Sequence, residues 1–401
     1  MFSKDSLPST IISKYAQVWW ENTALNKDVN SPFGAWLLVA LLAEHDQTGE
    51  ISRVLGVDAK EAKRLAEQFI LNPHPALKSA TALWGRLGLL NDLGSKFFLG
   101  NNPALPAGTM PTQEEADKWT AEKTSGMITE FPIKIKDDLA LVLASALMTD
   151  IAWIEPYQVV PAGELVSTFA NKTESCLKGE NVAFYNTKAA GLVAMHSAQS
   201  DNGLQVFSFM ASKDVSPAAL NQAAAEIIHP EGSKAEVVEI GALLLGEFLD
   251  GSASLVELDG FRDYEIVYLP AWKQEVDKGD ISKAPGVSEA LGVMSTFLKE
   301  PDGGVAKQSA VAEYGALGFR AVAVTAFGML GLAIPQKRLV REVTVRFNRP
   351  YLAIAVTSSM APDTQKGRGE VQVADKIWDG IPVFSAWVTH PVEATVGKEY
   401  E

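Results

Sequence analysis

The stretch that decides the fold is residues 308–335, which read QSAVAEYGALGFRAVAVTAFGMLGLAIP. Residues 321–335 carry no charge and are rich in alanine, valine and glycine. Alternating small residues at positions 321–325 favour a strand that can also exist in a second conformation. Composition alone leaves a buried hairpin equally open. A membrane helix is excluded, because the apolar run falls short of about 18 residues.

Aligned without a gap, this stretch resembles the hinge and reactive-centre loop of the serpins, whose usual pattern is HKAVLEVNEEGTEAAAATA. Val311 and Glu313 match the strand that leads into the hinge, and Gly318 matches the hinge glycine. Thr325 closes the run of small residues. The hinge that the resemblance implies consists of Gly318, Phe319, Arg320, Ala321, Val322, Ala323, Val324 and Thr325.

Further matches to the family lie elsewhere in the chain and in the right order. Residues 116–128 (ADKWTAEKTSGMI) resemble the helix end INxWVxxxTxGKI, and residues 139–153 (LALVLASALMTDIAW) resemble the central strand LVLVNAIYFKGKW. Residues 347–351 (FNRPY) resemble FNRPF, and residues 382–391 (PVFSAWVTHP) resemble LFMGRVVNP. The chain is therefore identified as a member of the serpin family. The resemblance implies an α+β fold with about nine helices around three β-sheets and an exposed reactive-centre loop over residues 318–340.

Length and composition bound the function classes. The 401 residues would suggest two or three domains, but a serpin of this size is one domain, here residues 1–401. The net charge of −14, without a long basic run, argues against nucleic acid and against polyanions such as heparin. Cys176 is the only cysteine, so no internal disulfide can form.

The N-terminal residues bear on localisation. Residues 1–20 contain no apolar core of signal-peptide length. As written, the chain is expected to be cytoplasmic, or secreted if a leader was removed. No membrane partner is expected, and the resemblance implies a monomer.

A second region bears on how the central sheet opens. Ser31 precedes Pro32 and an apolar run, which predicts a helix with Ser31 as its N-cap. In the serpin resemblance this is the buried second helix beneath the parting sheet. Ser145 stands where serpins usually have asparagine, and Gln308 where they usually have histidine. Because those two family residues hydrogen-bond beneath the sheet, the control of sheet opening is expected to differ here.

The resemblance implies a spring mechanism, in which the cleaved loop inserts as a new central strand. Period-two alternation puts the side chains at 319, 321, 323, 325 and 327 on one face. Arg320, the only charge, lies on the opposite face, so insertion buries no unpaired ion. Phe319 and Ala316 depart from the small residue and glutamate that inhibitory serpins usually have. A bulky first inserting side chain at 319 is expected to slow insertion.

The family's usual count from the hinge glycine places the scissile bond between Leu332 and Ala333. The segment from there to Phe347 is longer than is common, so this position can shift by several residues. Leu332 favours a chymotrypsin-, elastase- or subtilisin-like serine protease, with a cysteine protease as a further partner. Lys337 and Arg338 leave a trypsin-like alternative, but they lie too far from Gly318 for the usual insertion length.

Enzyme motifs are missing from the sequence. It contains no G-x-S-x-G, H-E-x-x-H or Walker motif, and its five histidines and one cysteine show no metal-ligand spacing, so no metal or cofactor is expected. His196 beside Ser197 is interpreted as a surface pair rather than part of a triad. The sequence therefore predicts a suicide inhibitor of a serine protease and no enzyme. The alternative is a non-inhibitory serpin acting as a binding, carrier or chaperone-like protein.

Overall fold

The structure is a computed structural model that describes residues 7–22, 29–85, 107–149, 151–166, 169–229, 231–240, 243, 252–260, 263–298, 305–319, 338–364 and 369–394. The fold is α+β, as predicted, with seven α-helices in the described residues against about nine expected. The helices are α1 (Pro8–Asn22), α2 (Pro32–Leu42), α3 (Glu50–Leu55), α4 (Ala59–Leu71), α6 (Gln113–Lys123), α7 (Pro217–Ile227) and α8 (Val287–Leu298). None of these described helices has the length and apolar composition needed to cross a membrane.

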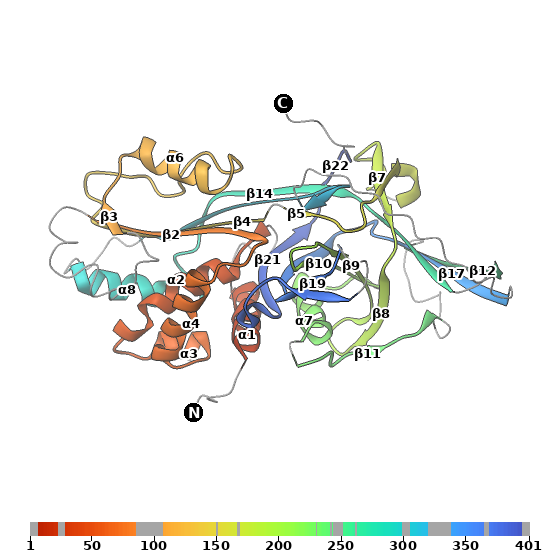
Figure 1. The fold of residues 1–401 in the computed structure, drawn as a ribbon, viewed down its shortest axis with the longest axis horizontal. Helices are drawn as coiled ribbons and strands as arrows, with labels where there is room; N and C mark the ends of the chain where they lie inside the picture. Colours follow the sequence, from red (N-terminus) through yellow and green to blue (C-terminus); the bar gives the residue numbers. More distant parts are fainter. Residues whose placement is uncertain are drawn as a thin grey trace.

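The central layer consists of two three-stranded sheets and a short link between them (Figure 1). One sheet has the order β3-β2-β4, and the other has the order β15-β14-β22. The link is the two-stranded pair of β16 and β5. The bounds are β2 (Leu77–Gly85), β3 (Ala107–Thr109), β4 (Leu141–Thr149), β5 (Ile151–Ala152), β14 (Ala271–Asp280), β15 (Lys307–Tyr314), β16 (Gly318–Phe319) and β22 (Pro391–Val392).

Two larger sheets accompany this central layer, and with it they correspond to the three β-sheets expected. The seven-stranded sheet has the order β1-β21-β18-β10-β9-β8-β11, and the five-stranded sheet has the order β12-β17-β13-β7-β6. The seven strands are β1 (Val29–Asn30), β8 (Val182–Thr187), β9 (Gly191–Gln199), β10 (Leu204–Ala211), β11 (Glu236–Val237), β18 (Tyr351–Thr357) and β21 (Ile381–Val388). The five are β6 (Gln158–Pro161), β7 (Ser175–Gly179), β12 (Ala253–Gly260), β13 (Tyr264–Leu269) and β17 (Arg338–Arg346). A separate small hairpin joins β19 (Met360–Pro362) to β20 (Glu370–Gln372).

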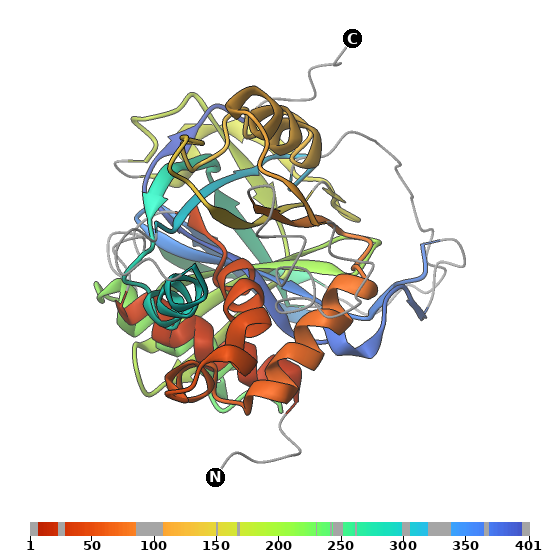
Figure 2. The same cartoon turned by 90° about the vertical axis from the view of Figure 1, so that its left-hand side faces the viewer.

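Helix α2 is enclosed in the core, in contact with β4 of the central layer and β21 of the seven-stranded sheet. It is apolar on all sides, and every residue of it except Leu38 is buried, as a helix inside a core must be. Its predicted cap is confirmed, because the backbone N–H of Gly34 donates to the Ser31 hydroxyl at 3.1 Å. Viewed end-on, α1 to α4 lie below the central layer and α6 lies above it (Figure 2). The layer is thus covered on both faces.

Candidate functional site

The central layer has one position at which two strand edges face each other without a ladder between them. β4 pairs with β2, and β15 pairs with β14, but within the described residues no ladder joins β4 to β15. Among the described residues, the strand pairing that links the two halves is that of Gly318 with Ala152 and of Phe319 with Ile151, in antiparallel register. We call this unpaired edge-to-edge region the open strand position. A strand there could complete the backbone hydrogen bonds of both β4 and β15.

Backbone hydrogen bonds hold the hinge closed at the end of the open strand position. The N–H of Trp153 donates to the carbonyl of Leu317 at 3.0 Å, and the N–H of Tyr157 donates to the carbonyl of Ala316 at 2.9 Å. The indole Nε1–H of Trp153 donates to the carbonyl of Gly315 at 3.0 Å. The strand that leads into the hinge is therefore fixed up to Phe319.

Phe319 is already part of the core before any cleavage. Its side chain is buried, and its ring lies 6.0 Å from the Trp272 ring and 6.4 Å from the rings of Trp153 and Tyr314. The expectation that Phe319 is the first side chain to insert is therefore wrong, and its effect on the rate of insertion stays a prediction. Insertion would begin one residue later, at position 320.

The limits of the predicted loop also change, because residues at both ends lie in strands. Gly318 and Phe319 form β16, and residues 338–340 begin β17. The other hinge residues, Arg320, Ala321, Val322, Ala323, Val324 and Thr325, and the bond between Leu332 and Ala333, lie outside the described residues. Their roles stay predictions.

A buried polar chain lies directly under the hinge. The Tyr157 hydroxyl lies 2.5 Å from both Nε2 of His196 and the Tyr314 hydroxyl, and Nδ1 of His196 lies 3.2 Å from the Asn181 carbonyl oxygen. Because a carbonyl only accepts, Nδ1–H donates and Nε2 accepts from Tyr157, which in turn accepts from Tyr314. The chain links the end of β15 to β9 without any charge.

Burial keeps this chain neutral. Desolvation lowers the pKa of His196 to about 4 and raises the pKa of Tyr157 above its ordinary value. The interpretation of His196 as a surface residue is wrong, since its side chain is 1% exposed. Period-two alternation could have indicated this, because His196 shares its face of β9 with Leu192, Ala194 and Ala198, which are all buried.

The predicted sheet-opening residues gather at the start of α2. The side chain of Gln308, on β15, accepts from the Ser31 N–H at 3.2 Å and donates to the Ser31 carbonyl at 3.1 Å. The Ser31 hydroxyl donates to the Val383 carbonyl at 2.8 Å. Ser145, on β4, approaches the same place, because a Cβ on Gly34 would lie 3.6 Å from the Ser145 hydroxyl. Gln308 thus binds the helix cap, where the family's histidine would bind the residue at position 145.

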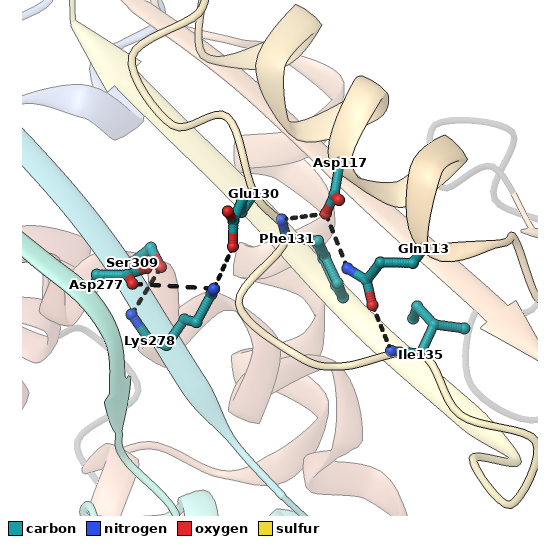
Figure 3. A network of polar contacts seen from close by, with 8 residues as sticks. All are labelled: Gln113, Asp117, Glu130, Phe131, Ile135, Asp277, Lys278 and Ser309. Carbon is teal, nitrogen blue, oxygen red and sulfur yellow. Dashed lines mark hydrogen bonds and ion pairs between the residues drawn. The ribbon is translucent and has the colours of Figure 1, made fainter.

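A segment between α6 and β4 connects the two halves of the central layer (Figure 3). The Phe131 ring packs beside Trp84 of β2, in a cluster that includes Val142 and Ala144 of β4. The neighbouring Glu130 forms an ion pair with Lys278 of β14, on the other half. We call the Glu130–Lys278 ion pair the clasp.

Both sides of the clasp are positioned by specific backbone features. Lys278 lies in a bulge of β14 with φ 53°, in the left-handed region, and its N–H donates to the Ser309 hydroxyl at 3.0 Å. On the other side, Phe131 N–H donates to Asp117 Oδ1 at 2.7 Å. Ion pairing with Glu130 raises the pKa of Lys278. The bulge therefore points the ammonium group at Glu130.

Outside the hinge, the features that could carry chemistry are metal-ligand clusters and cavities. Within the described residues, no three histidine, cysteine, aspartate or glutamate side chains lie close enough to hold a metal ion. A cavity of about 700 Å³ opens beside Tyr157 and His196, and Gln158, Lys178 and Asn181 contribute to its wall.

Comparisons with known proteins bear on the fold. No family model matches the sequence, and no curated protein matches it. Among solved structures, tengpin, a thermophilic serpin in the native state, is 13% identical with a TM-score of 0.61, over 97% of this chain and 95% of its own. Serpin48 of the insect Tenebrio molitor is 14% identical with a TM-score of 0.55, over 97% and 99%. Thyroxine-binding globulin in complex with thyroxine is 13% identical with a TM-score of 0.56, over 96% and 99%.

These likenesses span nearly the whole length of every chain compared. At such low identity they establish the fold and nothing finer. The chain has the serpin fold, as the sequence resemblance predicted.

Proposed function

We propose that this chain is a serpin-type suicide inhibitor of a serine protease. The observation that carries the proposal is the open strand position, which begins at Phe319, where the described part of the hinge ends. β16 turns back from β15 at residues 316–317, where the Gly315 N–H donates to the Gly318 carbonyl at 3.0 Å. Because β16 is antiparallel to β5, which continues β4, β4 and β15 run parallel to each other. A segment that continued β16 beyond residue 319 would run antiparallel to both β15 and β4. It would thereby satisfy the unpaired edges of both strands.

The trapping reaction follows from ordinary acyl transfer. The protease serine adds to the carbonyl carbon of Leu332, and the amide bond to the nitrogen of Ala333 breaks. The protease histidine carries the serine proton to the leaving amine, and an ester joins the enzyme to Leu332. Residues 320–332 are then free to insert, and they drag the acyl-enzyme along before water can hydrolyse the ester.

The apolar Leu332 supports a protease with an apolar primary pocket, of the chymotrypsin, elastase or subtilisin kind. A cysteine protease would form the equivalent thioester. We propose that the inhibitor acts as a monomer, because the mechanism needs one hinge and one open strand position, both supplied by the same chain.

The test is incubation with a panel of serine proteases, followed by denaturing gel electrophoresis and mass spectrometry of the cut site. An inhibitor yields a complex that survives denaturation. Cleavage between residues 320 and 337 should also raise the thermal midpoint sharply, because insertion adds a ladder on each side. Complete cleavage with an unchanged midpoint would exclude insertion.

A carrier function is the second candidate, supported by the cavity beside Tyr157 and His196. Its volume of about 700 Å³ lies in the range of small-molecule sites, and thyroxine-binding globulin is a fold neighbour that holds a small ligand. A carrier would be cut without forming a covalent complex, so the same gel separates the two candidates.

A further inference from the structure

Strand β12 forms a two-stranded ribbon with β17 at the edge of the five-stranded sheet. Eight consecutive pairs join them, from Ala253 opposite Val345 to Gly260 opposite Arg338. On its other side β17 pairs with β13 only from Glu342 onward. Residues 257–260 and 338–341 therefore form a tip that β13 does not back, and Figure 1 shows this ribbon extending beyond the rest of the molecule at the right. We call these eight residues the ribbon tip.

The ribbon tip lies close to the predicted scissile bond along the chain. Arg338 is five residues after Ala333, so the two Cα atoms are at most about 18 Å apart, even in a fully extended chain. A protease domain of about 240 residues has a radius of gyration of about 18 Å. A protease centred on the bond between residues 332 and 333 therefore reaches the ribbon tip.

The ribbon tip presents an apolar side chain in a polar surround. Leu339 is 62% exposed, the largest exposed fraction among the large hydrophobic side chains of the described residues. Alternation places it on the same face as the Arg341–Glu257 ion pair, whose Nε and Oε1 atoms are 3.2 Å apart. Asp263 accepts from the Arg341 N–H at 2.9 Å and holds the base of the tip. An exposed anchor with a charged rim on a rigid ribbon is suited to a protein partner.

We propose that the ribbon tip is a second contact site for the protease that cleaves the loop, with Leu339 buried against the rim next to its prime-side subsites. The partner is a serine protease with an apolar patch at that rim. The proposal rests on the loop being the cleaved segment, but it does not require trapping. Because β12 pairs with β17 from Arg338 to Val345, which includes the whole ribbon tip, the contact is presented with little loss of conformational freedom on binding.

The experiment compares cleavage of the whole protein by chymotrypsin, elastase and subtilisin at subsaturating concentrations. Leu339→Ser should lower kcat/KM roughly fivefold for at least one protease, the loss expected for an apolar contact of this size. Cleavage of a synthetic peptide of residues 326–337, which lacks the ribbon tip, should be slower than cleavage of the wild-type protein by a similar factor. The number of inhibitor molecules cleaved for each protease molecule trapped should be the same for Leu339→Ser and wild type.

Val256→Ser is the matched control. Val256 is 51% exposed on the same ribbon, but it lies opposite Glu342, behind the tip and on the other face. Its loss should leave kcat/KM unchanged. Equal rates for Leu339→Ser and wild type with all three proteases would overturn the proposal, and so would equal slowing by both variants. If the wild type is cut without forming a covalent complex, the inhibitory function fails, while the cleavage rates still decide the role of Leu339.

Discussion

Gln308 binds the cap of α2 with an amide at the position where the serpin resemblance places a histidine. Its oxygen and nitrogen each make one hydrogen bond to the backbone of Ser31, so both ends of the side chain are used. An amide does not titrate, whereas a histidine there would change charge between pH 5 and 8. The contact between β15 and α2 is therefore independent of pH, and the titratable group near the hinge is His196 instead.

His196 should make folding stability fall in acid. Its pKa is about 4 in the fold and about 6.5 in the unfolded chain. The unfolded state therefore binds the proton first, and stability is lost as the pH falls from about 6.5 to about 4. The loss is about 3 kcal/mol, at roughly 1.4 kcal/mol per pKa unit.

The variant His196→Gln isolates this effect, because glutamine can still accept from Tyr157 but does not titrate. Urea unfolding at several pH values measures it. The difference in unfolding free energy between wild type and variant should shrink between pH 6.5 and 4. A constant difference over that window would mean that His196 is not held neutral by burial.

Thr325 tests the parity of the inserting segment. Phe319 faces the core, so alternation predicts that Thr325 enters on the same side, where an unpaired guanidinium would be buried. Thr325→Arg should leave the native fold unchanged and be cut at the same bond, but it should form no covalent complex with the protease.

Arg320→Glu is the control for Thr325→Arg, because position 320 has the opposite parity and the change should have little effect. Gel electrophoresis after protease treatment reads both variants. Trapping by Thr325→Arg as efficient as in wild type would show that the register is wrong, and with it the assignment of Leu332 and Ala333.

For single residues, the sequence predicts a helix-capping hydrogen bond better than it predicts which side chains are buried. Ser31 was identified as a cap because serine before proline and an apolar run has a local meaning. The burial of Phe319 was missed, because it depends on Trp153 and Trp272, which are distant in sequence and approach it only in the folded molecule. The burial of His196 follows from the alternation along β9, which its neighbour Ser197 alone does not reveal.

At the scale of elements, the clasp connects the two halves of the central layer across the open strand position. Glu130 and Lys278 are 148 residues apart in sequence, and both side chains are partly exposed. Exposed ion pairs contribute about 0–1 kcal/mol to stability, so the clasp adds little to the free energy of unfolding. It instead joins the segment around Phe131, which packs beside Trp84 of β2, to β14 on the other half, so the halves cannot move apart there without breaking the ion pair.

Breaking the clasp should therefore speed insertion more than it destabilises the fold. We expect Glu130→Gln to accelerate loop insertion after cleavage severalfold, and high salt to do the same to the wild type by screening. Tryptophan fluorescence after rapid mixing with protease can follow insertion, since Trp153 and Trp272 lie against Phe319.

Glu122→Gln is the matched control for the clasp. It removes an exposed ion pair with Lys118 that lies within α6 and does not cross between the sheet halves. This variant should insert at the wild-type rate. Equal rates for wild type and Glu130→Gln would mean that the clasp does not restrain the sheet.

Helices and strands that depend on a local sequence pattern are predictable from the sequence. Strands that depend on pairing with a distant strand are not. The helix predicted after the Ser31 cap corresponds to α2 (Pro32–Leu42), and residues 139–153, which resemble the family's central strand, contain β4 (Leu141–Thr149). β12 was not predicted, because its pairing partner β17 begins 78 residues after its own last residue. Register with so distant a strand is fixed by tertiary structure, which composition and spacing do not reveal.

At the scale of the whole molecule, the fold holds its loop at both ends by different means. β16 holds one end with two register pairs. β17 holds the other end with eight pairs to β12, in addition to those with β13. Detaching β16 therefore breaks fewer hydrogen bonds than detaching β17. Once the loop is cut, its N-terminal part is thus the part that moves more easily.

This asymmetry predicts that β12 prevents the uncut loop from inserting. β4 and β5 extend from Leu141 to Ala152, a length of about 40 Å at roughly 3.3 Å per residue. An uncut loop that inserted fully would have to pass along this length and come back to β17, a path of about 80 Å. The 18 residues 320–337 cover at most about 60 Å. Full insertion would therefore detach about six residues of β17, and break their pairs with β12.

Replacing residues 254–258 of β12 with Gly-Ser-Gly-Ser-Gly should weaken those pairs, since glycine and serine lower strand propensity while every N–H remains. During incubation at elevated temperature, the uncut variant should convert to a form that has a raised thermal midpoint and that chymotrypsin no longer cuts. This conversion should be at least about tenfold faster than in wild type, because lowering the barrier by 1.4 kcal/mol raises a rate tenfold. Replacing residues 370–372 of β20 with Gly-Ser-Gly is the control, because β20 pairs with β19 and not with β17. The cut protein should gain stability, which shows that insertion itself is possible. If the uncut β12 variant then converts no faster than this control, weakening the pairs between β12 and β17 does not help release β17. That result would show that β12 does not restrain the uncut loop.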